Sequence, residues 1–240
     1  MRATEWRVER VESVGSTNDL VAGRARAGES EGLVVVADFQ ESGRGRRDRT
    51  WIAPPGSALL SSYLLRAPLP PDQRHWSLVA VALSARAALA PWGVVDVKWP
   101  NDLLVAEKKL GGLLAHVVDD GVVVGLGMNL RGIGSQVEGA TSVLESFGVN
   151  LDRDDLLDAL LDQLDIRRGL LNSSEGLANL REEYRASLVT LGRQVRCHLE
   201  SGVVRGVARE VDERGYLVVE GDETWTLSAA DVVHVRGEEV

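Results

Sequence analysis

The sequence predicts an α+β protein with a larger unit over residues 1–190 and a small all-β unit over residues 191–240. In the larger unit, β-branched runs alternate with segments whose apolar residues recur at helical spacing. After Gly192 the chain has short valine-rich segments separated by polar, glycine-containing turns, which is typical of a small β structure. We therefore place the boundary between the two units near residue 190.

Apolar patterns predict the strands of the larger unit. Residues 33–37, Leu-Val-Val-Val-Ala, form a continuous apolar run, which is typical of a strand buried on both faces. Residues 6–11 instead alternate apolar and polar side chains, as a half-buried strand does. The predicted strands cover residues 6–11, 33–37, 58–65, 94–99, 113–118 and 122–126, the last two as a hairpin.

Capping residues and leucine spacing predict the helices. Ser16 and Asn18 are both suitable N-caps for a short helix over residues 18–27. An Ala/Leu/Val-rich helix over residues 75–90 ends before Pro91, because proline disfavours a helical residue in front of it. Apolar residues on one face predict two further helices, over residues 152–164 and 177–188.

Composition excludes several classes of protein. The formal net charge is −9, which argues against broad nucleic-acid binding, because such binding neutralises phosphates with cations. The chain contains no apolar run close to the length of about 20 residues that spans a membrane. Cys197 is the only cysteine of the sequence, so no internal disulfide is possible, and a reducing cytoplasm is the expected compartment. One cysteine and four scattered histidines give no zinc motif.

A glycine–arginine loop over residues 43–49 stands out against this acidic background. It holds four arginines in seven residues. Glycines allow a close approach of the backbone, and guanidinium groups bind carboxylate or phosphate in a bidentate manner. The loop therefore predicts an anion site, although a basic surface loop or a nucleic-acid-binding arm has the same composition.

Other polar segments follow predicted strands or precede them. Residues 98–102, Lys-Trp-Pro-Asn-Asp, and residues 108–112, Lys-Lys-Leu-Gly-Gly, are two of them, and residues 125–129, Gly-Leu-Gly-Met-Asn, are a third. Each has an ordinary structural interpretation, as a strand terminator, a solvated lysine pair or a tight turn. The third lacks the third glycine and the helix of a dinucleotide-binding motif.

The order and spacing of these segments closely resemble those of the biotin protein ligase family. The matching segments are Ser16-Thr17-Asn18, Gln40 with the loop as far as Trp51, residues 98–102, Lys109-x-Gly111-Gly112 and Gly127-x-Asn129. The resemblance implies a mixed β-sheet flanked by helices, like that of class II aminoacyl-tRNA synthetases, and a small C-terminal SH3-like β-barrel. It also implies an enzyme that joins biotin to ATP, with Mg²⁺, and then transfers biotin to a lysine of a biotin carboxyl carrier domain.

The resemblance assigns roles to individual residues. The biotin-binding residues would be Ser16, Thr17, Asn18, Gln40, Gly43, Arg44, Gly45, Arg46 and Lys109. The ATP-binding residues would be Arg46, Arg49, Trp51, Asn101, Lys109 and Asn129. Arg46 and Lys109 would be catalytic, and Asp102 would organise the metal or accept a proton. The metal ligands are not identified by the resemblance.

The sequence departs from the family pattern at Asp48 and His116, where relatives often carry a small and an acidic residue, respectively. Many relatives also have an N-terminal DNA-binding domain and can form dimers through sheet edges. Since the first motif begins at Ser16, we expect a ligase without DNA binding. The alternatives are a lipoate or octanoate ligase or transferase with the same fold, and a non-catalytic nucleic-acid-binding module.

Overall fold

The computed structural model describes residues 5–47, 49–133 and 137–235, and Asp48 lies outside these residues. A seven-stranded sheet forms the centre of the larger unit, with strand order β1-β2-β3-β7-β6-β5-β4. Its strands are β1 (Arg7–Val14), β2 (Leu33–Gln40), β3 (Ala58–Leu65), β4 (Asp96–Lys98), β5 (Asp102–Val105), β6 (Lys108–Val118) and β7 (Gly121–Asn129). The sheet is mixed, because β1 and β2 are parallel whereas the other pairs are antiparallel.

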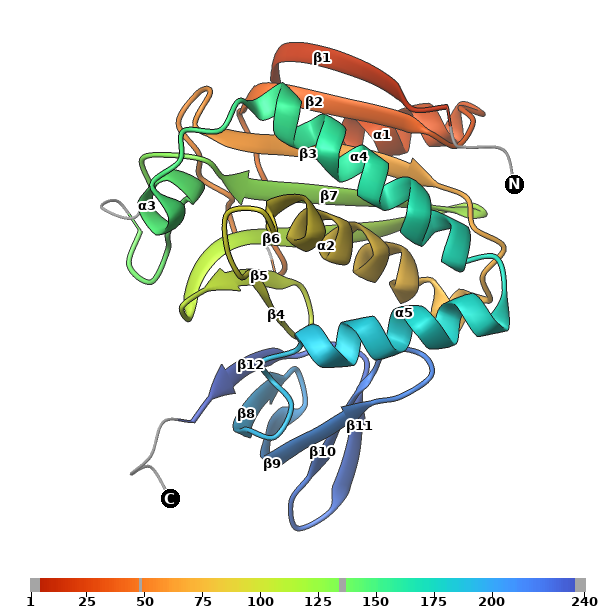
Figure 1. Cartoon of the computed structure of the whole chain (residues 1–240). Helices are drawn as coiled ribbons and strands as arrows, with labels where there is room; N and C mark the ends of the chain where they lie inside the picture. Colours follow the sequence, from red (N-terminus) through yellow and green to blue (C-terminus); the bar gives the residue numbers. More distant parts are fainter. Residues whose placement is uncertain (1–4, 48, 134–136, 236–240) are drawn as a thin grey trace.

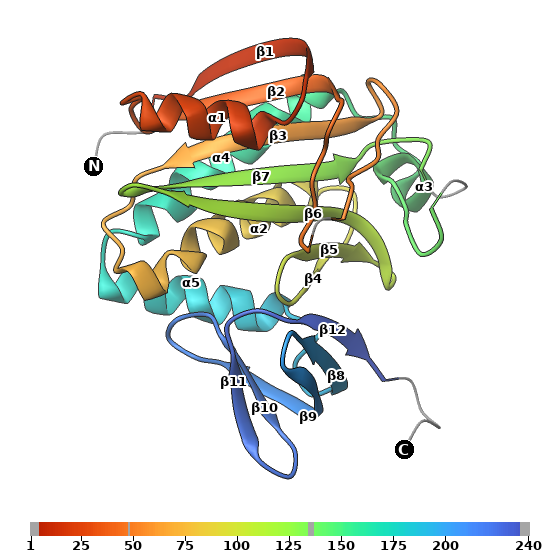
Figure 2. The same ribbon diagram turned by 180° about the vertical axis from the view of Figure 1, so that it is seen from behind.

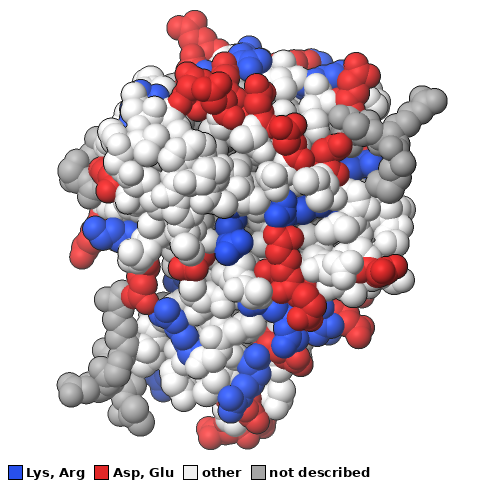
Figure 3. All heavy atoms as spheres, in the orientation of Figure 1, with Lys and Arg blue, Asp and Glu red and all other residues white. Residues whose placement is uncertain are grey.

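Helices cover both faces of this sheet. Helices α2 and α4 cross one face, and α1 packs on the other (Figures 1 and 2). The helices are α1 (Thr17–Arg26), the 3₁₀ turn η1 (Pro71–Gln73), α2 (His75–Leu89), α3 (Val143–Phe147), α4 (Arg153–Leu170) and α5 (Ser174–Ser187). Twelve residues of α2 are buried, which agrees with the apolar helix predicted there. Acidic side chains gather along the outer side of α4, where Asp155, Asp158 and Asp162 are exposed (Figure 3).

The C-terminal unit is a five-stranded antiparallel sheet below α5, with strand order β11-β10-β9-β8-β12 (Figure 1). Its strands are β8 (Gln194–Leu199), β9 (Gly202–Val211), β10 (Leu217–Glu220), β11 (Thr224–Leu227) and β12 (Asp231–His234). The predicted fold class, a helix-flanked mixed sheet followed by a small antiparallel β structure, is confirmed.

Two differences from the predicted elements bear on function. The chain reverses after residues 100–101, and the next residues form β5, which the sequence did not predict. The predicted strand over 94–99 is correspondingly shorter, since β4 covers Asp96–Lys98. The short helix α3 was also not predicted; it is capped by Ser142, whose Oγ accepts from Glu145 N.

Aromatic side chains join the two units. Trp76 Nε1 donates to the carbonyl of Glu213 at 2.9 Å, and Trp99 Nε1 donates to that of Gly215 at 3.1 Å. His75 lies against Trp76 and Tyr184, with ring centroids 6.4 Å away in each case. The two units are therefore joined by buried indoles as well as by the α5–β8 connection.

His75 is expected to make stability depend on pH. The residue is only partly exposed and its Nε2 is buried, and burial lowers its pKa from 6.5 to about 4, with the charge of Arg46 acting in the same direction. As the pH falls from about 6.5 to about 4, the unfolded chain binds a proton here that the folded chain excludes, so stability is lost in this window.

Urea unfolding at pH 7 and at pH 4 tests this effect. From pH 7 to pH 4, the free energy of unfolding of the wild type should fall more than that of His75→Gln, by up to about 3 kcal/mol. Carboxylate titration is common to both proteins, so the difference isolates His75. Equal losses in the two proteins would show that its environment does not favour the neutral ring.

Candidate active site

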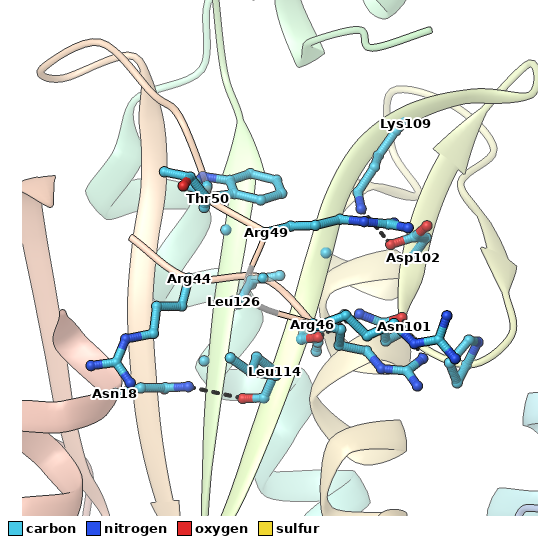
Figure 4. Close-up of a pocket in the computed structure, with 18 of the residues that line it drawn as sticks. Asn18, Arg44, Arg46, Arg49, Thr50, Asn101, Asp102, Lys109, Leu114 and Leu126 are labelled. Carbon is cyan, nitrogen blue, oxygen red and sulfur yellow. Dashed lines mark hydrogen bonds and ion pairs between the residues drawn. The ribbon is translucent and has the colours of Figure 1, made fainter. Parts of the chain in front are cut away.

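A pocket of about 740 Å³ lies between the seven-stranded sheet and the C-terminal unit. Its walls come from the start of α1, the arginine loop, the β4–β5 turn, the middle of β6 and β7, and β12. Figure 4 shows Asn18 and Leu114 on one side, and Asn101, Asp102 and Lys109 on the other.

The pocket brings together nearly all residues that the sequence predicted for the site. These are Ser16, Thr17, Asn18, Gln40, Arg44, Gly45, Arg46, Arg49, Trp51, Asn101, Asp102, Lys109 and Asn129. Gly43 is not among the lining residues. A Cβ atom at this position would lie 2.7 Å from the carbonyl oxygen of Trp51, so Gly43 allows the two ends of the loop to approach.

Hydrogen bonds fix the polar segment at the start of α1. The Oε1 atom of Gln40 accepts from Thr17 N at 2.8 Å and from Thr17 Oγ1 at 3.0 Å. Asn18 Nδ2 donates to the carbonyl of Leu114 at 3.0 Å, and Ser62 Oγ donates to Asn18 Oδ1 at 2.7 Å. Ser16 caps the helix, since its side chain accepts from Asp19 N. These bonds hold Thr17 and Asn18 at the pocket wall.

The arginine loop is a small hairpin. Arg44 and Thr50 form an antiparallel bridge, Trp51 N donates to Gly43 O at 2.9 Å, and Gly45 N donates to Arg49 O at 2.6 Å. Its arginines spread apart: Arg44 pairs with Asp19 of α1, whereas Arg46 Nη1 donates to Asn101 Oδ1 at 3.4 Å. The loop therefore places cations on both sides of the pocket (Figure 4).

Lys109 lies at the start of β6, on the side of the pocket that holds Asn101 and Asp102 (Figure 4). Its Nζ is 2.6 Å from Asp102 Oδ1 and 5.8 Å from the ring centroid of Trp51. Backbone bonds fix the strand here, because Lys109 N donates to Gly139 O at 2.8 Å and Thr141 N donates to Lys109 O at 2.9 Å. Two amides beside it are also held, since Asn101 Nδ2 donates to Leu113 O and Asn129 Nδ2 to Thr141 O.

Family models match most of the chain. Residues 11–130 match the model described as the biotin/lipoate A/B protein ligase family, and residues 190–235 match the biotin protein ligase C-terminal domain. The chain is 35% identical to a biotin–[acetyl-CoA-carboxylase] ligase of Mycobacterium tuberculosis, over 96% of this chain and 90% of that one.

The chain belongs to the biotin protein ligase family. It is 30% identical to the bifunctional ligase/repressor BirA of Escherichia coli, over 87% of this chain and 68% of that protein. Its fold is similar to that of a biotin protein ligase from Aquifex aeolicus solved in complex with biotin and ATP, with a TM-score of 0.81 and 25% identity. That likeness covers 96% of this chain and 99% of the other.

The pocket of this family member is positively charged within an acidic chain. The described lining residues include six cationic and three acidic side chains, whereas the whole chain has a net charge of −9. Burial lowers the pKa of Lys98, and the carboxylate of Asp102 opposes that shift. Burial likewise lowers the pKa of Arg46, although an arginine stays protonated in proteins. Such a pocket favours a ligand with several negative charges.

Several residues of the site were not predicted as site residues. Lys98, His116, Asp19 and Asp231 line the pocket, and the buried Ser62 supports it from β3. A signal for Ser62 existed, because Ser61-Ser62 interrupts an otherwise apolar strand. His116 also carried a signal, because it was noted above as a departure from the family pattern.

The described residues contain no group of three metal-ligating side chains. None of the helices in the described ranges has the length and apolar character needed to cross a membrane.

Ser62→Ala is expected to lower the free energy of unfolding by about 1–3 kcal/mol, because buried Asn18 Oδ1 would lose its donor. Ser84 is a matched control, since it is equally buried and donates to Ala80 O within α2. Ser84→Ala should cost less than about 1 kcal/mol, because that carbonyl keeps its helical partner. Urea unfolding compares the two variants, and equal losses would contradict a supporting role for Ser62.

Proposed function

We propose that the protein is an ATP-dependent biotin protein ligase, which forms biotinyl-5′-AMP and pyrophosphate and then transfers biotin to a lysine of a biotin carboxyl carrier domain. The observation that carries this proposal is the pocket itself. It joins a hydrogen-bonding segment at the start of α1 to a group of cations from the arginine loop and β6. A polar, uncharged ring system and a polyanion can therefore bind side by side.

The start of α1 is the proposed site of the biotin ring. Thr17, Asn18 and Gln40 offer hydroxyl and amide groups there, and Ser16 begins the helix. Gly125 lies next to Asn18, and a Cβ atom there would overlap the Asn18 amide. The small residue leaves the amide in place at the wall, where it can recognise a polar ligand group. Arg44, Gly45 and Arg46 would cover the ligand from the loop side, with Gly43 shaping the loop.

The first reaction brings two anions together. A biotin carboxylate oxygen attacks the α-phosphorus of ATP, the new P–O bond forms, and the bond to pyrophosphate breaks. Arg46 and Lys109 both line the pocket, Arg46 beside Asn101 and Lys109 beside Asp102. We propose that they offset the repulsion and stabilise charge on the transferring phosphoryl group. The loss of one such contact typically raises the activation barrier by about 3 kcal/mol.

Arg49, Trp51, Asn101 and Asn129 are the proposed residues of the nucleotide side. Mg²⁺ usually binds through substrate phosphates and one or two carboxylates, so the lack of a metal-ligating group among the described residues is compatible with it. Asp102 would fit that role, because it is a carboxylate in the wall of the pocket, where it pairs with Lys109. When bound, the ion would shield phosphate charge.

The second reaction transfers biotin to the carrier. The lysine nitrogen attacks the biotinyl carbonyl carbon, the amide bond forms, the bond to AMP breaks, and the amine loses a proton. Because the mixed anhydride reacts with water, the arginine loop would protect it by covering the pocket. In this proposal residues 1–190 form the ligase domain and residues 191–240 a separate small β domain, which supplies one wall of the pocket.

Other expectations stay predictions. The exposed acidic side chains along α4 and the net charge of −9 argue against a nucleic-acid partner. Assembly as a homodimer through an edge of the seven-stranded sheet and a cytoplasmic location are expected but rest on the sequence alone.

Incorporation of labelled biotin into a carboxylase carrier domain tests the function. We expect the wild type protein to label the carrier domain in an ATP-dependent reaction. Lys109→Gln should reduce the rate of labelling by about a hundredfold, because a loss of about 3 kcal/mol in transition-state stabilisation corresponds to about that factor. Lys108→Gln is the matched control, because Lys108 is the exposed neighbour outside the pocket, and it should leave the rate unchanged. Labelling with lipoate or octanoate in place of biotin would instead support the alternative ligase.

A further inference from the structure

The tip of the arginine loop rests on the C-terminal unit. Arg46 Nη1 donates to the carbonyl of Ala230 at 3.2 Å, and Arg47 Nη2 donates to the carbonyl of His198 at 2.6 Å. Arg47 Nη1 lies 3.3 Å from Asp231 Oδ2, and Arg49 pairs with the same carboxylate oxygen. Three successive arginines of the loop thus contact residues of the C-terminal unit that lie more than 150 positions further along the chain.

The acceptors of these bonds belong to one place in the C-terminal sheet. Asp231 is the first residue of β12, and it pairs in register with His198 of β8. Ala230 immediately precedes it and is fully buried. The carbonyl of His198 in β8, the carbonyl of Ala230 just before β12 and the carboxylate of Asp231 therefore form a docking site next to the β8–β12 ladder.

Asp231 is the charged centre of this dock. Its side chain is 24% exposed, whereas that of Arg49 is 68% exposed, so the ion pair joins a largely exposed arginine of the loop to a more buried carboxylate. Among its described residues, the hairpin is held by backbone hydrogen bonds at its base and across its tip. Since ordering a long arginine side chain costs rotamer entropy, the loop needs such an external partner to stay over the pocket.

We propose that Asp231 is a positioning residue, which docks the arginine loop on the C-terminal unit and so keeps the acyl-adenylate enclosed. This inference rests on the proposed function. The carboxylate acts through Arg47 and Arg49 and takes no part in the bond-making steps. The C-terminal unit then has a defined task, because its displacement would release the loop and expose the mixed anhydride to water and to stray amines.

The test measures the lifetime of enzyme-bound labelled biotinyl-5′-AMP after dilution into unlabelled biotin. We expect Asp231→Asn to shorten this lifetime by about tenfold, a change that corresponds to about 1.4 kcal/mol. The rate of pyrophosphate release should fall less than the lifetime does. Asp222→Asn is the matched control, since Asp222 is exposed in the same unit and lies outside the pocket lining, and it should retain the wild type lifetime.

A double-mutant cycle separates docking from loss of folding. Arg49→Gln removes one of the two arginine contacts of Asp231 from the loop side, so Asp231→Asn combined with Arg49→Gln should shorten the lifetime by less than the product of the two separate effects. Asp231→Glu, which keeps the charge, should recover much of the lifetime. Additive effects, or a wild type lifetime in Asp231→Asn, would overturn the docking role. A wild type protein that forms no adenylate at all would instead contradict the proposed function.

Discussion

The site depends on one constraint, which is that several positive charges have to lie close together around one pocket. Six cationic side chains line the pocket of a chain whose net charge is −9, and they would repel one another without compensation. Three carboxylates provide it: Asp19 pairs with Arg44, Asp102 with Lys109, and Asp231 with Arg47 and Arg49. Each comes from a different element, namely α1, β5 and β12.

This arrangement explains why the site needs the whole fold. The order of the seven-stranded sheet places β7 beside β3 and β6, so the start of α1, the loop and the strand that carries Lys109 meet around the pocket. The C-terminal unit closes the remaining side, and the indoles of Trp76 and Trp99 hold its turn over residues 213–215 against the larger unit. The charge pairs leave cations in surplus, which suits a polyanionic substrate.

The sequence predicted most of the site, because its motifs lie in short contiguous segments. The arginine loop, residues 98–102 and Lys109 each carried a local signal, and the fold brings them together. Gly43 was predicted to bind biotin, yet it is absent from the pocket lining and instead allows the loop to close at its base. The assignment of ligands to individual residues stays a prediction.

Sequence reasoning missed features that depend on distant partners. Asp231 stands in an unremarkable Ala-Ala-Asp-Val segment, and its contact with Arg49 spans 182 positions. Nothing local distinguishes it from other surface carboxylates. Strand β5 was missed for a similar reason: its four residues form a strand through pairing with β4 and β6, not through a strong pattern of their own.

The salt dependence of ATP affinity tests the central claim most directly. Calorimetry would follow the dissociation constant as ionic strength rises from about 0.01 M to about 0.15 M, which shortens the screening length from about 30 Å to about 8 Å. If surplus positive charge selects the substrate, ATP binding weakens steadily over this range, whereas binding of uncharged biotin amide stays constant. An ATP affinity that does not respond to salt would contradict the account.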